Sequence, residues 1–418
     1  MKNLIKFFIG AGKLKRIKRA GWVLRNVDNP ESISDHTYRL ALMTWILSPK
    51  NLNLKKMLIM SLIHDLCEVY SGDTTPYDDL VEKGGKKVTE KWPRRTSKER
   101  LDFSARKFKK EYEGWQKIIK YLPADLKSKL ELLWLDYTQS KSNEAKFIRQ
   151  IEKIENLLQA ISYSKRHKNI ALRPFWVEIS ESVYDHKIIK LVNAIKNFND
   201  SKQNNNEINS LVKFLFEVGK LKENKRRGWL IRGVENPDSI ASHSFRSAIM
   251  GLVLSYGKKI DQEVILKMAL SHDLYAVNSG DLTPYEESIK GGKKDRAIFE
   301  SLPWRGSQGK KEIISKKRFE EELKYFDPLV KLLPHEIRHD VKYLWLEYKV
   351  GGSREGRFLR QVDVLESLFQ GLEFKIENKN LHLNPFWLQC KELIDDQKLL
   401  EFMSETDHYF YVTKKLQH

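Results

Sequence analysis

The chain has little cysteine and no long apolar run. Cys67 and Cys390 are the only cysteines among 418 residues, which excludes a disulfide framework and a thiolate metal cluster and fits a reducing cytoplasm. No stretch approaches the roughly 18 consecutive apolar residues that a membrane-spanning helix needs. The basic start at 1–22 has a near copy at 211–229, and an internal repeat of a targeting signal would make no sense. We expect a soluble cytoplasmic protein with no membrane partner.

Acidic residues are fewer than basic ones, 56 against 75, and the formal net charge is +19. Such a charge raises the local concentration of anions, including nucleotides and RNA. Acidic residues are nevertheless interspersed among the lysines, and the chain has no arginine-rich tract or aromatic-basic nucleic-acid motif. We assign most of the charge to solvated surfaces, and we do not favour a nucleic-acid partner.

The alternating pattern of β-strands is nearly absent as well. Apolar residues instead recur at three- and four-residue spacing, which predicts helices, and a charged helix is expected at 98–120. In the first half of the chain the apolar pattern covers 4–17, 31–48, 55–71, 124–139 and 144–162. The fold class predicted from this pattern is all-α.

The chain contains two copies of one unit. Residues 21–39, GWVLRNVDNPESISDHTYR, align without gaps to 228–246, GWLIRGVENPDSIASHSFR, with ten identities in nineteen positions. The offset between the copies is 207 here and grows to 211 further on, so the repeats are colinear over nearly the whole length. An Asn-rich polar segment separates them and reads as a linker. We predict an N-terminal domain at 1–198, a linker at 199–209 and a C-terminal domain at 210–418.

Both copies keep histidine and aspartate inside otherwise apolar helices. His36 matches His243, and the pair His64-Asp65 matches His272-Asp273. Such groups are costly to bury unless they are paired, hydrogen-bonded or bound to a metal. Imidazole and carboxylate are good ligands for divalent first-row metals. Although a single buried histidine is usually a core residue, the repeated set favours a metal site.

These motifs resemble the HD-domain superfamily of metal-dependent phosphohydrolases, in which a histidine, a His-Asp pair and a distant aspartate bind the ion. The stretches GWVLRNV, NPESISDHTYR, HDLCEVYSGDTTPYD and EAKFIRQIEKIENLLQA are most similar to the HD-domain 5′-deoxynucleotidases. The resemblance covers nearly all of each repeat. It implies two HD-type helical domains, and since related enzymes are commonly homodimers, it also implies an intramolecular pseudo-dimer packed about a pseudo-twofold axis.

The resemblance implies one ligand set in each copy. The first set is His36, His64, Asp65 and Glu152, and the second is His243, His272, Asp273 and Asp363. Glu152 departs from the family, which has aspartate there. The cofactor implied is a divalent ion such as Mn, Co, Mg, Zn or Fe.

Glu68 in the first copy is replaced by Ala276 in the second. On a continuous helix Glu68 would share a face with His64 and Asp65 and could reach a phosphate or a bound water. In the similar enzymes a glutamate at this position takes part in proton transfer during hydrolysis. We therefore expect the first copy to be catalytic and the second to lack its acid-base group.

Asp73 and Asp281 each follow a glycine, which permits a turn that directs the carboxylate back toward the site. In the similar nucleotidases this aspartate, and the tryptophan that matches Trp22 and Trp229, lie near the sugar and help to select deoxyribose. For the tryptophans, packing of the first helix is an equally good interpretation.

Several arginines are candidates for substrate binding. Family members often have an arginine directly before this tryptophan, where the present chain has glycine in both copies. Whether the nearby Arg19 and Arg227 take that role is left open. Arg25 and Arg232 recur in both copies as candidates for phosphate contacts or structural ion pairs.

The function implied is hydrolysis of a deoxynucleoside 5′-monophosphate by a metal-activated water, with Glu68 supplying or relaying the proton for the leaving oxygen. Two alternatives stay open. One is a tandem protein that binds metal or nucleotide without turnover, and the other is hydrolysis of a nucleoside triphosphate, a signalling nucleotide or an oligonucleotide end.

Overall fold

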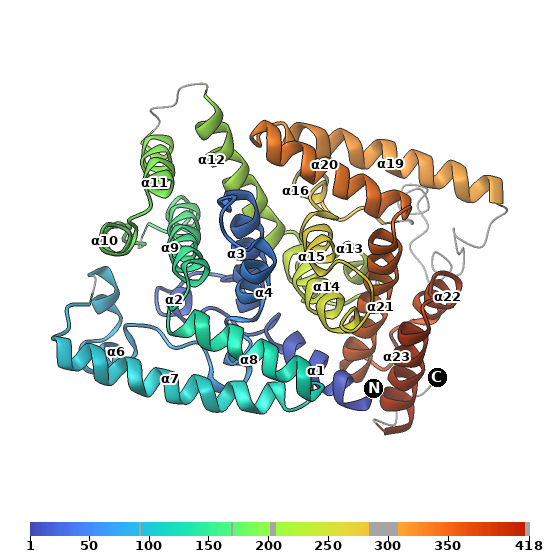
Figure 1. The fold of residues 1–418 in the computed structure, drawn as a ribbon, viewed down its shortest axis with the longest axis horizontal. Helices are drawn as coiled ribbons and strands as arrows, with labels where there is room; N and C mark the ends of the chain where they lie inside the picture. The colour runs from blue at the N-terminus through green and yellow to red at the C-terminus, as the bar shows by residue number, and fades with distance from the viewer. Residues whose placement is uncertain (92, 169, 201–205, 284–307, 414–418) are drawn as a thin grey trace. The chain divides into compact units, whose positions relative to one another are not determined.

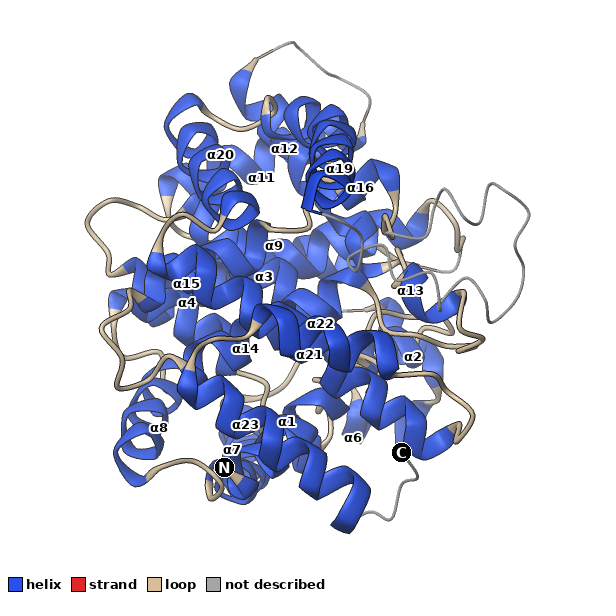
Figure 2. Ribbon diagram, turned by 90° about the vertical axis from the view of Figure 1, so that its right-hand side faces the viewer, coloured by secondary structure: helices blue, strands red, loops and turns tan. Residues whose placement is uncertain are grey.

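The computed structural model describes residues 1–91, 93–168, 170–200, 206–283 and 308–413. The described residues are helical, with two isolated β-bridges and no strand, so the predicted all-α class is confirmed (Figure 2). No helix in this part of the chain combines the length and apolar character needed to cross a membrane.

The described residues form two compact units. The N-terminal unit comprises Lys6–Lys222 with Leu332–Pro334, and the C-terminal unit comprises Met1–Ile5, Glu223–Lys331 and His335–His418. The predicted boundary, with 199–209 as a linker, stays a prediction, and 201–205 lie outside the described residues. The pseudo-twofold packing of the two domains also stays a prediction.

The helices of the first repeat come first along the chain, and α12 and η2, which open the second repeat, follow them (Figure 1). They are α1 (Lys2–Lys13), α2 (Ala20–Val23), α3 (Ile33–Leu47), α4 (Leu54–Ile63), α5 (Glu68–Ser71), α6 (Asp78–Gly84), η1 (Lys86–Glu90), α7 (Ser97–Ile119), α8 (Ala124–Thr138), α9 (Asn143–Ser164), α10 (Arg173–Ser182), α11 (His186–Asn199), α12 (Glu207–Glu217) and η2 (Val218–Lys222).

The remaining helices repeat the same order. They are α13 (Arg227–Leu230), α14 (Ile240–Leu254), α15 (Gln262–Ser271), α16 (Ala276–Ser279), α19 (Gln308–Val330), α20 (His335–Val350), α21 (Arg354–Glu377), α22 (Asn384–Leu393), α23 (Gln397–Asp407) and η4 (His408–Thr413).

Helix α3 is at the centre of the N-terminal unit and packs against α4 and α9. It begins with a capping box in which the Ser32 side chain accepts from the Asp35 backbone, while the Asp35 side chain accepts from the Ser32 backbone. Nearly every residue of α3 is buried, including His36 and Arg39. Helices α14, α15 and α21 pack in the same way in the C-terminal unit. Polar groups on these central helices therefore need partners inside the protein.

The segment predicted as one helix at 55–71 is interrupted, so this prediction is wrong in part. Helix α4 ends at Ile63, a turn covers 64–67, and α5 begins at Glu68. The indole Nε1 of Trp134 donates to the His64 carbonyl at 3.1 Å, and the Glu68 N–H instead donates to the Asp65 carbonyl at 3.0 Å. A side chain from α8 therefore takes the carbonyl that an α-helix would have offered to Glu68.

Candidate functional site

Two histidines of the N-terminal unit face each other from α3 and the end of α4. Their ring centroids are 5.6 Å apart. His36 Nδ1 is bonded to Glu155 Oε2 at 2.5 Å, and His64 Nδ1 to the Ser61 carbonyl at 2.7 Å. Both Nε2 atoms are buried and have no hydrogen-bond partner among the described residues. Because a bond at one ring nitrogen directs the other toward an ion, this arrangement suits metal-binding histidines.

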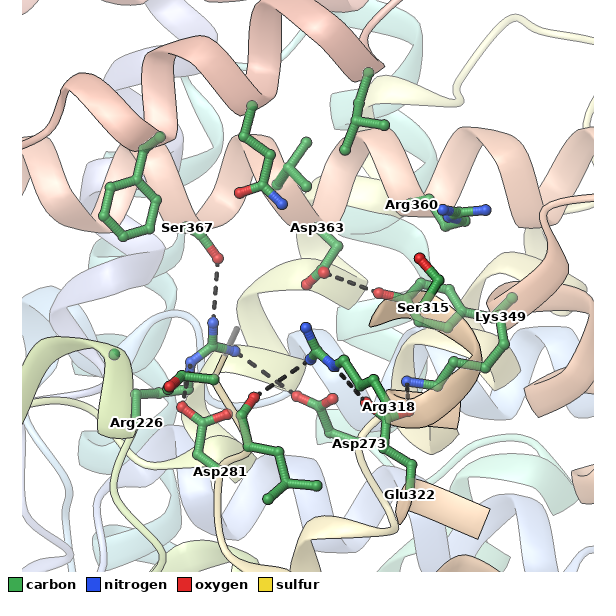
Figure 3. A pocket seen from close by; sticks show the side chains of 18 of the residues that line it. Arg226, Asp273, Asp281, Ser315, Arg318, Glu322, Lys349, Arg360, Asp363 and Ser367 are labelled. Atoms are coloured by element: carbon green, nitrogen blue, oxygen red, sulfur yellow. Dashed lines mark hydrogen bonds and ion pairs between the residues drawn. The ribbon is translucent and has the colours of Figure 1, made fainter. Parts of the chain in front are cut away.

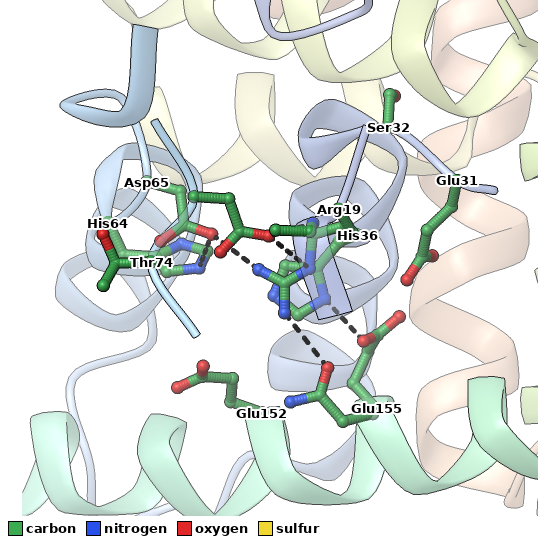
Figure 4. A network of polar contacts seen from close by, with 12 residues as sticks. Arg19, Glu31, Ser32, His36, His64, Asp65, Thr74, Glu152 and Glu155 are labelled. Atoms are coloured by element: carbon green, nitrogen blue, oxygen red, sulfur yellow. Dashed lines mark hydrogen bonds and ion pairs between the residues drawn. The ribbon is translucent and has the colours of Figure 1, made fainter. Parts of the chain in front are cut away.

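Asp65 completes a group of three donors whose atoms lie within 4.8 Å of one another (Figure 4). Its Oδ2 lies 3.0 Å from His64 Nε2 and 3.3 Å from Arg19 Nη1. Burial alone would raise the pKa of Asp65, but the charges of His64 and Arg19 outweigh burial and hold it below its usual range. An ionised carboxylate beside two unbonded imidazole nitrogens fits a divalent cation.

Glu152, the predicted fourth ligand, lies on α9 across from His64 and Asp65 (Figure 4). Its Oε2 accepts a hydrogen bond from the Tyr137 hydroxyl at 2.6 Å. Burial opposes its ionisation, but the positive charges of Lys153 and Arg149 lower the pKa of Glu152 well below the ordinary value. It supplies a second negative charge to this site, although it is not one of the three clustered donors.

Glu68 is almost completely buried, with 2% exposed surface, and its Oε2 has no hydrogen-bond partner within the described part of the chain. Burial, followed by the negative charges of Asp65 and Asp73, raises the pKa of Glu68 well above its ordinary value. The pKa of Glu68 is thus shifted in the opposite direction from those of Asp65 and Glu152, and such a separation suits a proton donor beside ionised carboxylates.

Asp73 connects the SGD turn to the start of α2. Gly72 has a φ of 71°, and Asp73 Oδ2 accepts from the Ala20 backbone N–H at 2.7 Å. The same oxygen lies 4.0 Å from Arg19 Nε. Although burial lowers the pKa of Arg19, the charges of Asp73 and Asp65 raise it above its ordinary value, so Arg19 stays cationic.

Lys107 on α7 is a site residue that sequence reasoning missed. Its Nζ donates to the Thr74 carbonyl at 3.3 Å and pairs with Glu111 at 3.4 Å. Burial opposes its charge, yet Glu111 and Glu68 raise the pKa of Lys107 above its ordinary value. At the repeat offset of 211, Lys107 aligns with Arg318, so both copies have a basic residue at this position. This alignment is the sequence signal that could have identified Lys107.

Trp22 and Arg25 lie in a packed cluster at the edge of this site. Trp22 is buried, donates from Nε1 to Glu31 at 2.7 Å and stacks on Phe175. The Arg25 guanidinium lies 5.0 Å from the Phe175 ring centroid and donates to the Gly21 carbonyl at 2.9 Å. These contacts pack Trp22 and Arg25 against Phe175 of α10, and a sugar or phosphate contact by either residue stays a prediction.

The corresponding residues of the C-terminal unit pack in the same way. Trp229 stacks on Phe386 with ring centroids 4.7 Å apart, and Arg232 lies over the same ring. Arg232 also donates to the Gly228 carbonyl at 2.7 Å.

The second candidate metal group differs from the first in its fourth predicted ligand, which is Asp363 in place of Glu152. His243, His272 and Asp273 again lie within 4.8 Å of one another. Asp363 Oδ1 is 2.8 Å from His243 Nε2 and 3.6 Å from His272 Nε2, so this carboxylate lies next to both imidazoles. Burial raises its pKa, but the hydrogen bond and charge of His243 dominate and lower the pKa of Asp363 to about 2.

A cavity of about 340 Å³ lies beside this second group (Figure 3). Its basic lining residues are Arg226, Arg232, Arg318, Lys349 and Arg360. Arg226 matches Arg19 and lies 3.7 Å from both Asp273 and Asp281. Arg227, the residue considered from sequence, instead donates its backbone N–H to Asp281 at 2.8 Å. The buried Ala276 offers no acid at the position of Glu68.

Comparison with known proteins gives the same family for both repeats. A family described as HD domain matches residues 11–196 and again 218–398. The 5′-deoxynucleotidase HDDC2 of Homo sapiens is 32% identical over 196 residues, covering 47% of this chain and 85% of the relative. The 5′-deoxynucleotidase HDDC2 of Dictyostelium discoideum is 32% identical, covering 46% and 94%.

Among solved structures, a conserved hypothetical protein from Pyrococcus furiosus is 26% identical, with a TM-score of 0.35. It covers 47% of this chain and 99% of its own.

Proposed function

Because this chain belongs to the HD-domain family in two successive copies, we propose that it is a metal-dependent phosphohydrolase that acts on deoxynucleoside 5′-monophosphates. The relatives that carry the name 5′-deoxynucleotidase each match about half of this chain, the length of one repeat. The N-terminal unit is the catalytic one in this proposal.

A divalent ion held by His36, His64 and Asp65, with Glu152 opposite, would lower the pKa of a bound water and neutralise phosphate charge. Glu155 orients His36, and the Ser61 carbonyl orients His64, each through the Nδ1 atom. The donor set combines imidazole, which suits Zn and Fe, with carboxylate, which suits Mg and Mn, so the residue types alone do not select one ion among Mn, Co, Mg, Zn and Fe.

The observation that carries the proposal is the buried Glu68 carboxyl, whose Oε2 has no hydrogen-bond partner among the described residues and whose pKa is raised by burial and by the nearby Asp65. When phosphate is cleaved from the 5′-oxygen, the leaving alkoxide needs a proton. A carboxylic acid within reach of that oxygen supplies the proton in the transition state. The carboxylate that results is stabilised by the nearby cations Arg19 and Lys107.

Arg19 and Lys107 also bring positive charge to the place where the phosphate would lie. Asp73 is fixed by the Ala20 N–H and can accept a hydrogen bond from the sugar. Trp22, through its contacts with Glu31 and Phe175, would support the wall against which the sugar packs.

Phosphate release from a panel of deoxy- and ribonucleotides, with Mn, Co, Mg and Zn supplied separately, tests this proposal. Glu68→Ala is expected to lower turnover by about 10²–10⁴-fold, the usual contribution of a general acid. Asp363→Ala changes the metal group of the other half, and we expect it to alter metal content or stability while turnover persists. Full turnover in Glu68→Ala, or none in the unaltered protein with any metal, would refute the proposal.

A second candidate function applies to the C-terminal unit, which we propose binds a nucleotide without hydrolysing it. The basic lining of its cavity, together with Ala276 in place of the acid, favours this role. Retention of a labelled nucleotide by a Glu68→Ala protein, with no phosphate released, is the expected result.

A further inference from the structure

The N-terminal unit contains a buried lysine that belongs, by sequence, to the second repeat. Lys222 is the last residue of η2 and is 4% exposed. By the offset of 207 it is the counterpart of Lys15, yet it lies in the same compact unit as α3 and α9. The second copy therefore contributes a charged residue to the interior of the unit that holds the catalytic site.

The Lys222 ammonium is fully engaged by groups next to the site. Nζ donates to Glu31 Oε2, to Glu155 Oε1 at 2.5 Å and to Gln159 Oε1 at 3.1 Å. Three donors and three acceptors match, which is the full hydrogen-bonding capacity of an ammonium group. Glu31 and Glu155 are themselves buried, and a buried carboxylate is costly unless it is paired. Lys222 pairs with both, and Glu155 also accepts from Arg39 Nε at 2.9 Å.

Both of these carboxylates contact residues of the proposed site. Glu155 holds His36 Nδ1 with its other oxygen, and Glu31 accepts from the Trp22 indole through its other oxygen. Lys222 thus binds both the carboxylate that orients His36 and the carboxylate that accepts from Trp22. Glu31, His36 and Glu155 also resemble a metal group by distance, but the cation among the two carboxylates is Lys222.

The backbone around Lys222 is fitted to this place. A Cβ on Gly219 would lie 2.7 Å from Arg39 Nη1, so η2 passes close to the arginine that also binds Glu155. Val218 and Leu221, on either side, have no exposed surface. These contacts leave the η2 segment little freedom to shift while the ammonium stays in position.

We propose that Lys222 is a positioning residue for the N-terminal metal site, so that this site is complete only when the second repeat is present. The inference rests on the proposed metal-binding role of His36. It acts through Glu155, because loss of the ammonium would remove one of the contacts that hold this carboxylate in place against His36 Nδ1. Because both repeats belong to one chain, Lys222 is covalently linked to the unit whose carboxylates it binds.

Mn²⁺ binding by the full-length chain tests the proposal independently of turnover. His272→Ala serves as the background, so that titrations followed by electron paramagnetic resonance report the N-terminal ligand set. Lys222→Met is expected to raise the dissociation constant for Mn²⁺ about 10–100-fold, the usual effect of losing a group behind a metal ligand. The matched control is Lys220→Met, since Lys220 is half exposed and pairs with Glu217 at the surface.

Thermal unfolding is measured on the same samples to separate positioning from folding. If Lys222→Met does not fold, the double variant Lys222→Met/Glu31→Gln, which removes one of the buried negative charges, replaces it. Unchanged Mn²⁺ affinity in whichever variant folds, or an equal loss in Lys220→Met, would overturn the proposal. Absence of phosphatase activity with a normal response of Mn²⁺ affinity would instead contradict only the proposed function.

Discussion

Glu68 and Ala276 occupy the same place in the two repeats, and both are buried. Several neighbouring groups match: Arg19 matches Arg226, Asp73 matches Asp281, and the basic positions Lys107 and Arg318 donate to matching carbonyls. The C-terminal unit therefore lacks one acid in a site whose charged framework is kept. Proton donation is the single step that this difference would remove.

Ala276→Glu should restore part of that step. The variant is made in a Glu68→Ala background, and phosphate release is expected to rise above that background because the new carboxyl would lie beside Asp273, as Glu68 lies beside Asp65. The measurement is release from deoxynucleoside monophosphates in the presence of Mn²⁺. If no activity returns while the protein folds and binds metal, the proposal that the second unit lacks only its acid is wrong.

Lys107 gives a second prediction at this scale. Lys107→Met should raise the Michaelis constant for the monophosphate about tenfold, because a charge-assisted hydrogen bond to phosphate contributes roughly 1.5–3 kcal/mol. Lys110→Met removes an equal charge from an exposed position of the same helix and serves as the control. Equal effects of both variants would assign the change to overall charge.

At the scale of elements, the short α5 is held against the long α7 by a close backbone contact. A Cβ on Gly114 would lie 2.5 Å from the Cys67 carbonyl and 3.2 Å from the Ser71 nitrogen. The position that matches Gly114 in the second repeat is Tyr325, so this approach is particular to the N-terminal unit. The contact supports the turn that carries Asp65 and the start of α5, where Glu68 lies.

Gly114→Ala should lower the free energy of unfolding by about 1–3 kcal/mol, as expected for overpacking. Turnover should fall as well, because α5 must shift. Gly309→Ala is the matched control: it also lies in a helix, with no atom within 4 Å of its added Cβ, and alanine there should leave stability unchanged or raise it by up to about 1 kcal/mol. Urea denaturation measures both. A stable, fully active Gly114→Ala protein would contradict the close contact.

At the scale of the whole molecule, the boundary between the compact units does not coincide with the boundary between the sequence repeats, because α12 and η2 lie between the two boundaries. By sequence these elements open the second repeat, yet they lie with the first in the N-terminal unit. Their apolar side chains Val212, Leu215, Val218 and Leu221 are without exposed surface. The N-terminal unit therefore uses residues beyond the end of its own repeat.

A chain shortened to residues 1–222 should accordingly be more stable than one shortened to 1–199. Each fully buried aliphatic side chain contributes about 1.5–3 kcal/mol, so the free energies of unfolding should differ by several kcal/mol. Urea denaturation of the two shortened chains is the measurement. Both shortened chains lack Leu332–Pro334, so they differ only in residues 200–222. Equal urea midpoints would show that α12 and η2 do not contribute to the stability of the N-terminal unit.

Much of the candidate site could be predicted because its residues recur. The His-Asp pairs, His36 and His243 were recognisable in two aligned copies, and the resemblance supplied Glu152 and Asp363. Lys107 was missed because it lies in a charged helix whose pattern resembles a solvated surface. Glu155 and Lys222 were missed because a buried ion pair 67 positions apart leaves no local pattern.

The sequence by itself determined the all-α class, the duplication and the residue types of both candidate metal groups, because periodicity and repetition can be read along the chain. Only the tertiary structure decided that the helix at 55–71 breaks after Ile63, that Asp363 closes on both imidazoles, and that Lys222 lies behind His36 in the unit of the first repeat. The physical reason is that these features depend on contacts between distant segments: an indole that takes a carbonyl, a carboxylate that reaches across, and an ammonium among buried acids.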